Sequence, residues 1–85
     1  MLDVIEELMH KGVELHKSGK VEVAAQLYSV VLKEHPEHPD ANHNMGVLAV
    51  GIGKIPEALR FFETALEANA DVAQFWVSYI DALIR

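Results

Sequence analysis

The chain has 85 residues, enough for one small domain whose hydrophobic core is only marginally large enough for stability. Its 13 acidic residues outnumber its 7 lysines and arginines, so no basic stripe for nucleic acid is expected, and the lack of cysteine excludes disulfides and thiolate metal sites. Apolar runs fall short of the ~18 residues of a membrane span, and the first residues are acidic where a secretory signal is basic. We therefore expect a cytoplasmic protein without nucleic-acid or membrane partners.

The first predicted helix begins near the N-terminus and ends at a glycine. Asp3 can cap it, with Glu6 three residues later as the reciprocal partner of a capping box. Leu8 and Leu15 lie at helical spacing. Gly19 can take the left-handed conformation that closes a helix. We therefore predict a helix from about residue 4 to the turn at Gly19.

A second helix is predicted from about Val21 to a proline turn at residues 35–39. Proline disfavours helical geometry in the residue before it, so Pro36 ends this helix. Its apolar stripe comprises Val23, Ala24, Leu27, Tyr28, Val31 and Leu32. The third helix is predicted to be capped by Asp40 and to continue to about Gly51. Its packing residues are Met45, Leu48 and Ala49.

Two more helices complete the predicted set. Pro56 suits the first turn of the fourth helix, where its missing N–H costs nothing. Asp71 and Gln74 repeat the capping-box spacing before the fifth. The apolar residues of the fourth helix are Ala58, Leu59, Phe62, Ala65 and Leu66, and those of the fifth are Phe75, Trp76, Tyr79, Ile80, Leu83 and Ile84. The pattern predicts an all-α protein without strands.

The same pattern of small, aromatic and turn residues occurs twice, at a constant separation of 34 residues. The matching pairs are Gly12 and Gly46, Gly19 and Gly53, Ala24 and Ala58, Tyr28 and Phe62, Leu32 and Leu66, and Pro36 and Ala70. A period of about 34 residues indicates a solenoid of helix–turn–helix units. We predict one domain over residues 1–85, with a first repeat over about 5–38, a second over about 39–72, and a half repeat or capping helix over 73–85.

In its repeats the chain resembles a tetratricopeptide repeat protein. The second unit carries the family pattern in Met45-Gly46, Gly53, Ala58, Phe62 and Ala65, preceded by Ala41 and Asn42, and Trp76 stands where the family favours tryptophan. The resemblance implies a right-handed superhelical stack of antiparallel helix hairpins, in which Phe62 and Trp76 fill the gaps between hairpins. Ile80 departs from the family's small residue, which favours a last helix that caps the stack or binds a partner.

The resemblance also implies a concave groove, lined by the first helix of each hairpin, that binds an extended protein or peptide segment. The groove candidates are Met9, His10, Val13, His43, Asn44, Val47, Gln74 and Ser78. Family members that grip a C-terminal carboxylate use a five-residue clamp, of which only Asn44 is present here, so an adaptor for chaperone tails is not expected. Asn44 can bond the N–H and C=O of an extended ligand, or it can bond a neighbouring helix or water. Met9 and Val13 either form an adaptable apolar patch or pack against the neighbouring helix.

Neither a metal site nor catalysis is predicted. His10, His16 and His43 share the concave face but lack the i, i+4 spacing that lets two histidines converge on one ion. His35 and His38 lie in the proline turn and are expected to be solvated, which favours at most a pH-sensitive surface. The sequence contains no phosphate-binding loop or recognisable Ser/His/Asp set. We therefore expect a non-catalytic protein without a cofactor.

The last helix carries more large apolar groups than one packed side requires. An uncovered apolar face usually marks an interaction site, and in a two-fold dimer two such helices pack symmetrically. The candidates for self-association are Tyr79, Ile80, Leu83 and Ile84. The leading hypothesis is a peptide-binding interaction module. Its alternatives are a homo-oligomerisation unit, or the N-terminal repeat part of a larger transferase-type enzyme.

Overall fold

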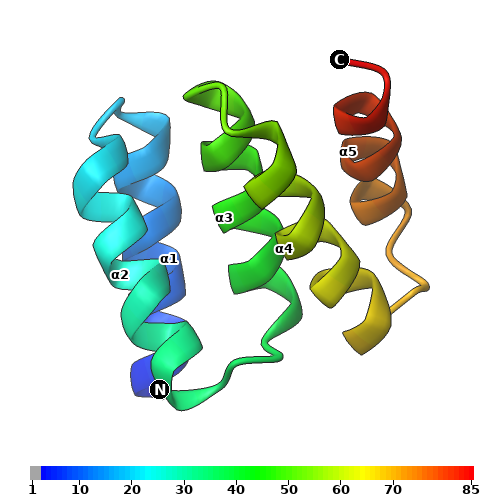
Figure 1. Ribbon diagram of the computed structural model, residues 1–85. Helices are drawn as coiled ribbons and strands as arrows, with labels where there is room; N and C mark the ends of the chain where they lie inside the picture. Colours follow the sequence, from blue (N-terminus) through cyan, green and yellow to red (C-terminus); the bar gives the residue numbers. More distant parts are fainter. Residues whose placement is uncertain (1–2) are drawn as a thin grey trace.

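The computed structural model describes residues 3–85, and this part of the chain forms five helices and no strand. The helices are α1 (Val4–Lys17), α2 (Val21–Glu34), α3 (Pro39–Gly51), α4 (Ile55–Ala68) and α5 (Ala73–Leu83). Figure 1 shows them side by side, each antiparallel to the one before, with the start of α1 and the end of α5 at opposite corners of the row. The molecule is elongated, 38 × 26 × 20 Å. The predicted all-α stack of two hairpins and a fifth helix is confirmed.

Several helix ends follow the predictions. The Asp3 carboxylate accepts a hydrogen bond of 2.8 Å from the Glu6 backbone N–H and so caps α1. Gly19 and Gly53 have φ angles of +82° and +80°, the left-handed conformation that only glycine adopts without strain. Pro56 lies in the first turn of α4. These features place the same tight turn in both hairpins.

The start of α3 differs from the prediction, because His38 and not Asp40 caps the helix. The Ala41 backbone N–H donates to His38 Nδ1 at 3.1 Å, which requires an unprotonated Nδ1. Pro39 takes the first helical position, where its restricted φ suits the helix, so α3 begins earlier than predicted. Asp40 lies in the first turn instead. His38 is half-buried and is therefore less solvated than expected.

The predicted capping box before α5 is also wrong. The helix begins at Ala73, and Val72 at its N-cap offers no side-chain hydrogen bond. Asp71 belongs to the preceding turn, where its backbone N–H donates to Asn69 Oδ1 at 3.0 Å. An asparagine side chain that bonds the backbone two residues ahead forms a turn of its own, and this turn competes with helix initiation at Asp71.

Within each hairpin, a glycine lets an aromatic ring lie directly against the opposing helix. A Cβ atom at Gly12 would overlap the ring of Tyr28, and a Cβ at Gly46 would overlap the ring of Phe62. Both rings are almost completely buried. Phe62 therefore packs inside its own hairpin and, in one buried cluster with Ala82 of α5, also fills the gap to the next helix as predicted. Trp76 is not a gap filler: it is 44% exposed, and its indole N–H donates to the Ala70 carbonyl.

The core consists of three clusters in succession along the stack. The first joins α1, α2 and α3 through Met9, Ala24, Tyr28, Val31, Ala41 and Leu48. The second contains Ala49, Ala58, Phe62 and Ala82, and the third contains Ala65, Leu66 and Phe75. Each cluster joins neighbouring helices only, so the stack is held together by nearest-neighbour packing.

Candidate functional site

An open depression of about 530 Å³ lies between α1 and α3. It is lined by Met9, His10, Val13, Glu14, Lys17, Asp40 and Asn44. Four of these residues, Met9, His10, Val13 and Asn44, are candidates predicted from the sequence. Residues three or four apart on a helix share one face, which explains why α1 contributes positions 9, 10, 13, 14 and 17. We call this depression the α1–α3 groove.

The floor of the α1–α3 groove is apolar and its edges are polar. Met9 is 9% exposed and Val13 is half-buried, whereas His10 is exposed. Met9 belongs to the first core cluster, so one side of it packs inward while it also lines the groove. Met9 can therefore both pack against the neighbouring helix and form part of an adaptable apolar patch, the two alternatives that the sequence left open.

Asn44 is half-buried at the groove and lies beside the hydroxyl of Tyr28. That hydroxyl is buried and makes no hydrogen bond of good geometry, although the Asn44 side chain is near enough to act on it by hydrogen bonding. Burial raises the pKa of Tyr28 above its ordinary value, and the neighbouring Asn44 side chain partly opposes the rise. A polar group buried without a partner costs about 1–3 kcal/mol. A buried hydroxyl without a well-formed hydrogen bond thus lies beside one of the predicted ligand-contacting residues.

Three other predicted residues meet at the junction of α3 and α5. His43 Nε2 and Ser78 Oγ are 2.8 Å apart and form a hydrogen bond between the two helices. Gln74 Nε2 donates to the same Ser78 oxygen at 3.4 Å. The His43 ring stacks on Phe75 with centroids 4.9 Å apart and is tilted against Phe62 at 5.6 Å. The polar groups of this junction therefore bond one another.

The surroundings of His43 favour its neutral form. Burial lowers the pKa of this imidazole below its ordinary value. The Asn44 side chain and the negative charge of Asp40 act in the opposite direction but are the smaller causes. A neutral His43 can bond Ser78 in either tautomer, as donor or as acceptor.

Val47 lies one turn farther along α3. It is half-buried and packs against the second core cluster, and it is not among the residues that line the α1–α3 groove. The eight predicted groove residues thus divide into an open set on α1 and α3, a bonded set across α3 and α5, and Val47 against the core.

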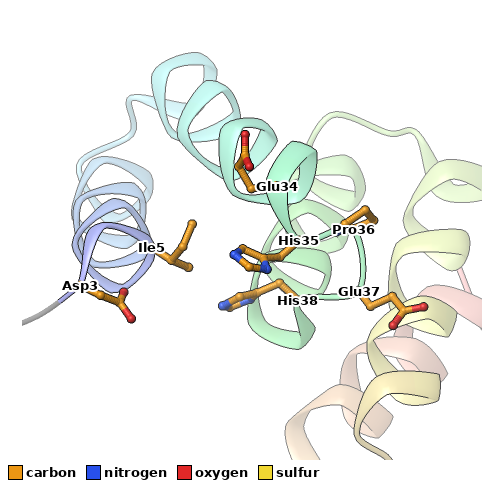
Figure 2. A pocket seen from close by; sticks show the side chains of 7 residues that line it. All are labelled: Asp3, Ile5, Glu34, His35, Pro36, Glu37 and His38. Atoms are coloured by element: carbon orange, nitrogen blue, oxygen red, sulfur yellow. The ribbon is translucent and has the colours of Figure 1, made fainter.

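A second depression, of about 650 Å³, was not predicted from the sequence. It is lined by Asp3, Ile5, Glu34, His35, Pro36, Glu37 and His38. In Figure 2 the His35 and His38 rings face α1 side by side, whereas Glu37 points away from them. Across residues 3–85, no group of three or more histidines and carboxylates is arranged to hold a metal ion. The depression forms between the start of α1 and the end of α2. Because these segments are far apart in the sequence, no short sequence motif indicates it.

The outer surface of α5 is apolar and uncovered. Val77, Ile80, Leu83 and Ile84 are 58%, 53%, 54% and 78% exposed. Tyr79, also predicted for self-association, packs toward the core, and its hydroxyl donates to Glu63 on α4 at 3.0 Å. In the described part of the chain, no helix is long and apolar enough to cross a membrane.

Comparison with known families supports the repeat architecture. A family model described as tetratricopeptide repeat matches residues 15–78, which runs from the end of α1 into α5. The match includes both turn glycines, Gly19 and Gly53, and both buried aromatic rings, Tyr28 and Phe62.

Proposed function

Because the chain belongs to the tetratricopeptide repeat family, we propose that it is a non-catalytic protein-interaction module that binds an extended protein or peptide segment in the α1–α3 groove. Family membership indicates protein–protein interaction in general. The observation that supports this particular groove is the combination of an apolar floor with an accessible amide at Asn44. The cytoplasmic location and the lack of nucleic-acid partners remain predictions.

The chemistry of the groove suits a peptide backbone. An extended segment presents one N–H and one C=O at every residue, and an asparagine side chain can bond both. Met9 and Val13 offer apolar surface on which a small side chain of the ligand can be buried. Methionine is flexible and polarisable, and it adapts to ligands of different shape.

The Ser78–His43 pair supports a structural role more than a catalytic one. Its 2.8 Å separation would suit a nucleophile and a general base. Acyl transfer also requires N–H donors aimed at the developing oxyanion. Both residues lie inside helices, where the backbone N–H groups bond within the helix. The bond instead joins α5 to α3.

The test is binding of pools of random synthetic octapeptides, immobilised on a surface, to the labelled protein. We expect Asn44→Ala to weaken binding of the retained peptides about two- to tenfold, the usual range for one hydrogen bond. Gln26→Ala, which removes an exposed amide from α2, is the matched control and is expected to bind as the wild type does. Equal binding by wild type and Asn44→Ala would contradict the proposed site.

A second candidate function is self-association through α5, supported by its four exposed apolar residues. Light scattering over a concentration series is expected to show the mass rising from 9.5 kDa toward twice that value. Leu83→Asp should abolish the rise because it places a charge in the contact. Val30→Asp, on the exposed face of α2, is the control and should leave association unchanged. A wild-type monomer at every concentration would contradict this candidate. The third hypothesis, a larger transferase-type enzyme, stays a prediction.

A further inference from the structure

We propose that the α1–α3 groove selects a basic ligand: an extended segment whose lysine or arginine pairs with Asp40 while a small apolar side chain lies over Met9 and Val13. This inference rests on the proposed function of the groove and specifies the class of partner. It follows from the charges around the groove and from the unsatisfied hydroxyl beneath it.

Asp40 is the unmatched charge of the groove. The other charged residues that line it are Glu14 and Lys17. These two lie three residues apart on α1, on the same face, where opposite charges offset each other. The ion pair found within residues 3–85 joins Arg85 to Asp81, so neither Asp40 nor Glu14 forms a close ion pair there, but Asp40 has no lysine or arginine on its own helix to offset it. A cationic side chain from a ligand would supply one.

The imidazole of His43, which is near Asp40, does not compensate the charge of that carboxylate. His43 is next to Asn44 on α3, and burial lowers the pKa of its imidazole. The chain as a whole carries a net charge of −6, which raises the local concentration of basic partners at low ionic strength. The electrostatic preference is therefore for positive ligands.

The Tyr28 hydroxyl adds a constraint on the orientation of Asn44. It is buried without a hydrogen bond of good geometry, and its polar neighbour is the Asn44 side chain at the groove. When Tyr28 donates to Asn44 Oδ1, the amide N–H₂ group is directed to a ligand carbonyl. A ligand that holds Asn44 in this orientation satisfies the buried hydroxyl at the same time.

The spacing along α3 defines a short recognition pattern. Asp40 and Asn44 are four residues apart, about 6 Å along a helix that rises 1.5 Å per residue. An extended ligand covers that distance in two residues, at about 3.3 Å each. Side chains two positions apart in an extended segment point to the same side. We therefore expect the basic residue two positions from the residue whose peptide group bonds Asn44.

The experiment uses octapeptide pools in which one position is held as lysine, arginine, leucine or glutamate and the others are random. The wild type should retain lysine and arginine pools most strongly, with retention that falls as salt is added. Asp40→Asn should reduce the preference for these pools about two- to fivefold, as expected for one exposed ion pair. Asp40→Glu, which keeps the charge, should restore most of it.

The matched control is Glu57→Gln. Glu57 occupies the first turn of α4 as Asp40 occupies the first turn of α3, so each substitution removes one acid from a helix N-terminus. Glu57→Gln should leave the basic preference intact, and circular dichroism should show that all variants are folded. Retention of no pool would contradict the proposed function itself. Retention without a basic preference, or a preference that survives Asp40→Asn, would overturn this inference and leave peptide binding in place.

Discussion

The two junctions between successive hairpin units are built from equivalent positions but end in different chemical states. At the α1–α3 junction, Tyr28 and Asn44 leave a buried hydroxyl unpaired beside an accessible amide. Thirty-four residues later, Phe62 and Ser78 occupy the same positions, and Ser78 bonds His43. One junction is thus unsatisfied and open to a ligand, while the other is bonded and closed by α5. Small changes at equivalent repeat positions decide whether a surface binds a partner or stabilises the stack.

The largest expected effect on stability comes from removing the large buried ring at the closed junction. Phe62→Ala should lower the free energy of unfolding by about 3–5 kcal/mol, because a large ring that is 1% exposed is removed from the core. Phe61→Ala is the matched control: its ring is half-buried, so the loss should be clearly smaller. Urea unfolding followed by circular dichroism measures both values. Similar losses for the two variants would contradict the assigned packing.

Gly46→Ala should have the next largest effect. The added Cβ would overlap the Phe62 ring, and overpacking of this kind typically costs about 1–3 kcal/mol. Gly51→Ala is the control in the same helix, because its Cβ would meet no atom within 4 Å. Helix propensity alone should make Gly51→Ala neutral or more stable by up to about 1 kcal/mol. If Gly46→Ala is as stable as Gly51→Ala, the close approach of ring and helix is not required.

Helices and their packing were predictable because their signals are local and repeated. Gly12 with Tyr28, and Gly46 with Phe62, repeat at one period, so the hairpins and their contact faces could be inferred together. The helix caps were harder to predict, since Asp40 is an acceptable cap residue and only the position of Pro39 makes His38 the better one. A preference for one residue type does not decide between two cap candidates that lie two residues apart.

The division of the candidate site into open and bonded parts could not be read from the sequence. His43 and Ser78 are 35 residues apart, one more than the repeat period, and this offset was the available signal for their contact. Their bond depends on how closely α5 packs against α3. That distance is set by the shapes of the side chains in the core. The depression lined by Asp3 and His38 likewise depends on where the two ends of the first hairpin meet.

A smaller effect is expected from Tyr28→Phe, which gives the open junction the same ring as the closed one. Removing an unpaired buried hydroxyl should leave the free energy of unfolding unchanged or raise it by about 1 kcal/mol. Peptide retention should fall, because in the proposed bound state Asn44 loses the hydroxyl that donates to its side-chain oxygen. Urea unfolding and the octapeptide pools measure the two effects. A loss of stability would show that the hydroxyl already has a partner.

Acidification should weaken the closed junction, in a direction that follows from the pKa of His43. Burial lowers this pKa in the folded protein, so the unfolded chain, with an imidazole near its ordinary value of about 6.5, binds a proton more readily. The contribution of His43 is therefore complete above about pH 6.5 and is lost as the pH falls from that value toward the lower folded pKa. Urea midpoints measured from pH 8 to pH 5 should decline in the wild type and decline less in His43→Gln. An unchanged pH dependence in His43→Gln would show that its burial does not govern protonation, and the difference between the two junctions would then rest on packing alone.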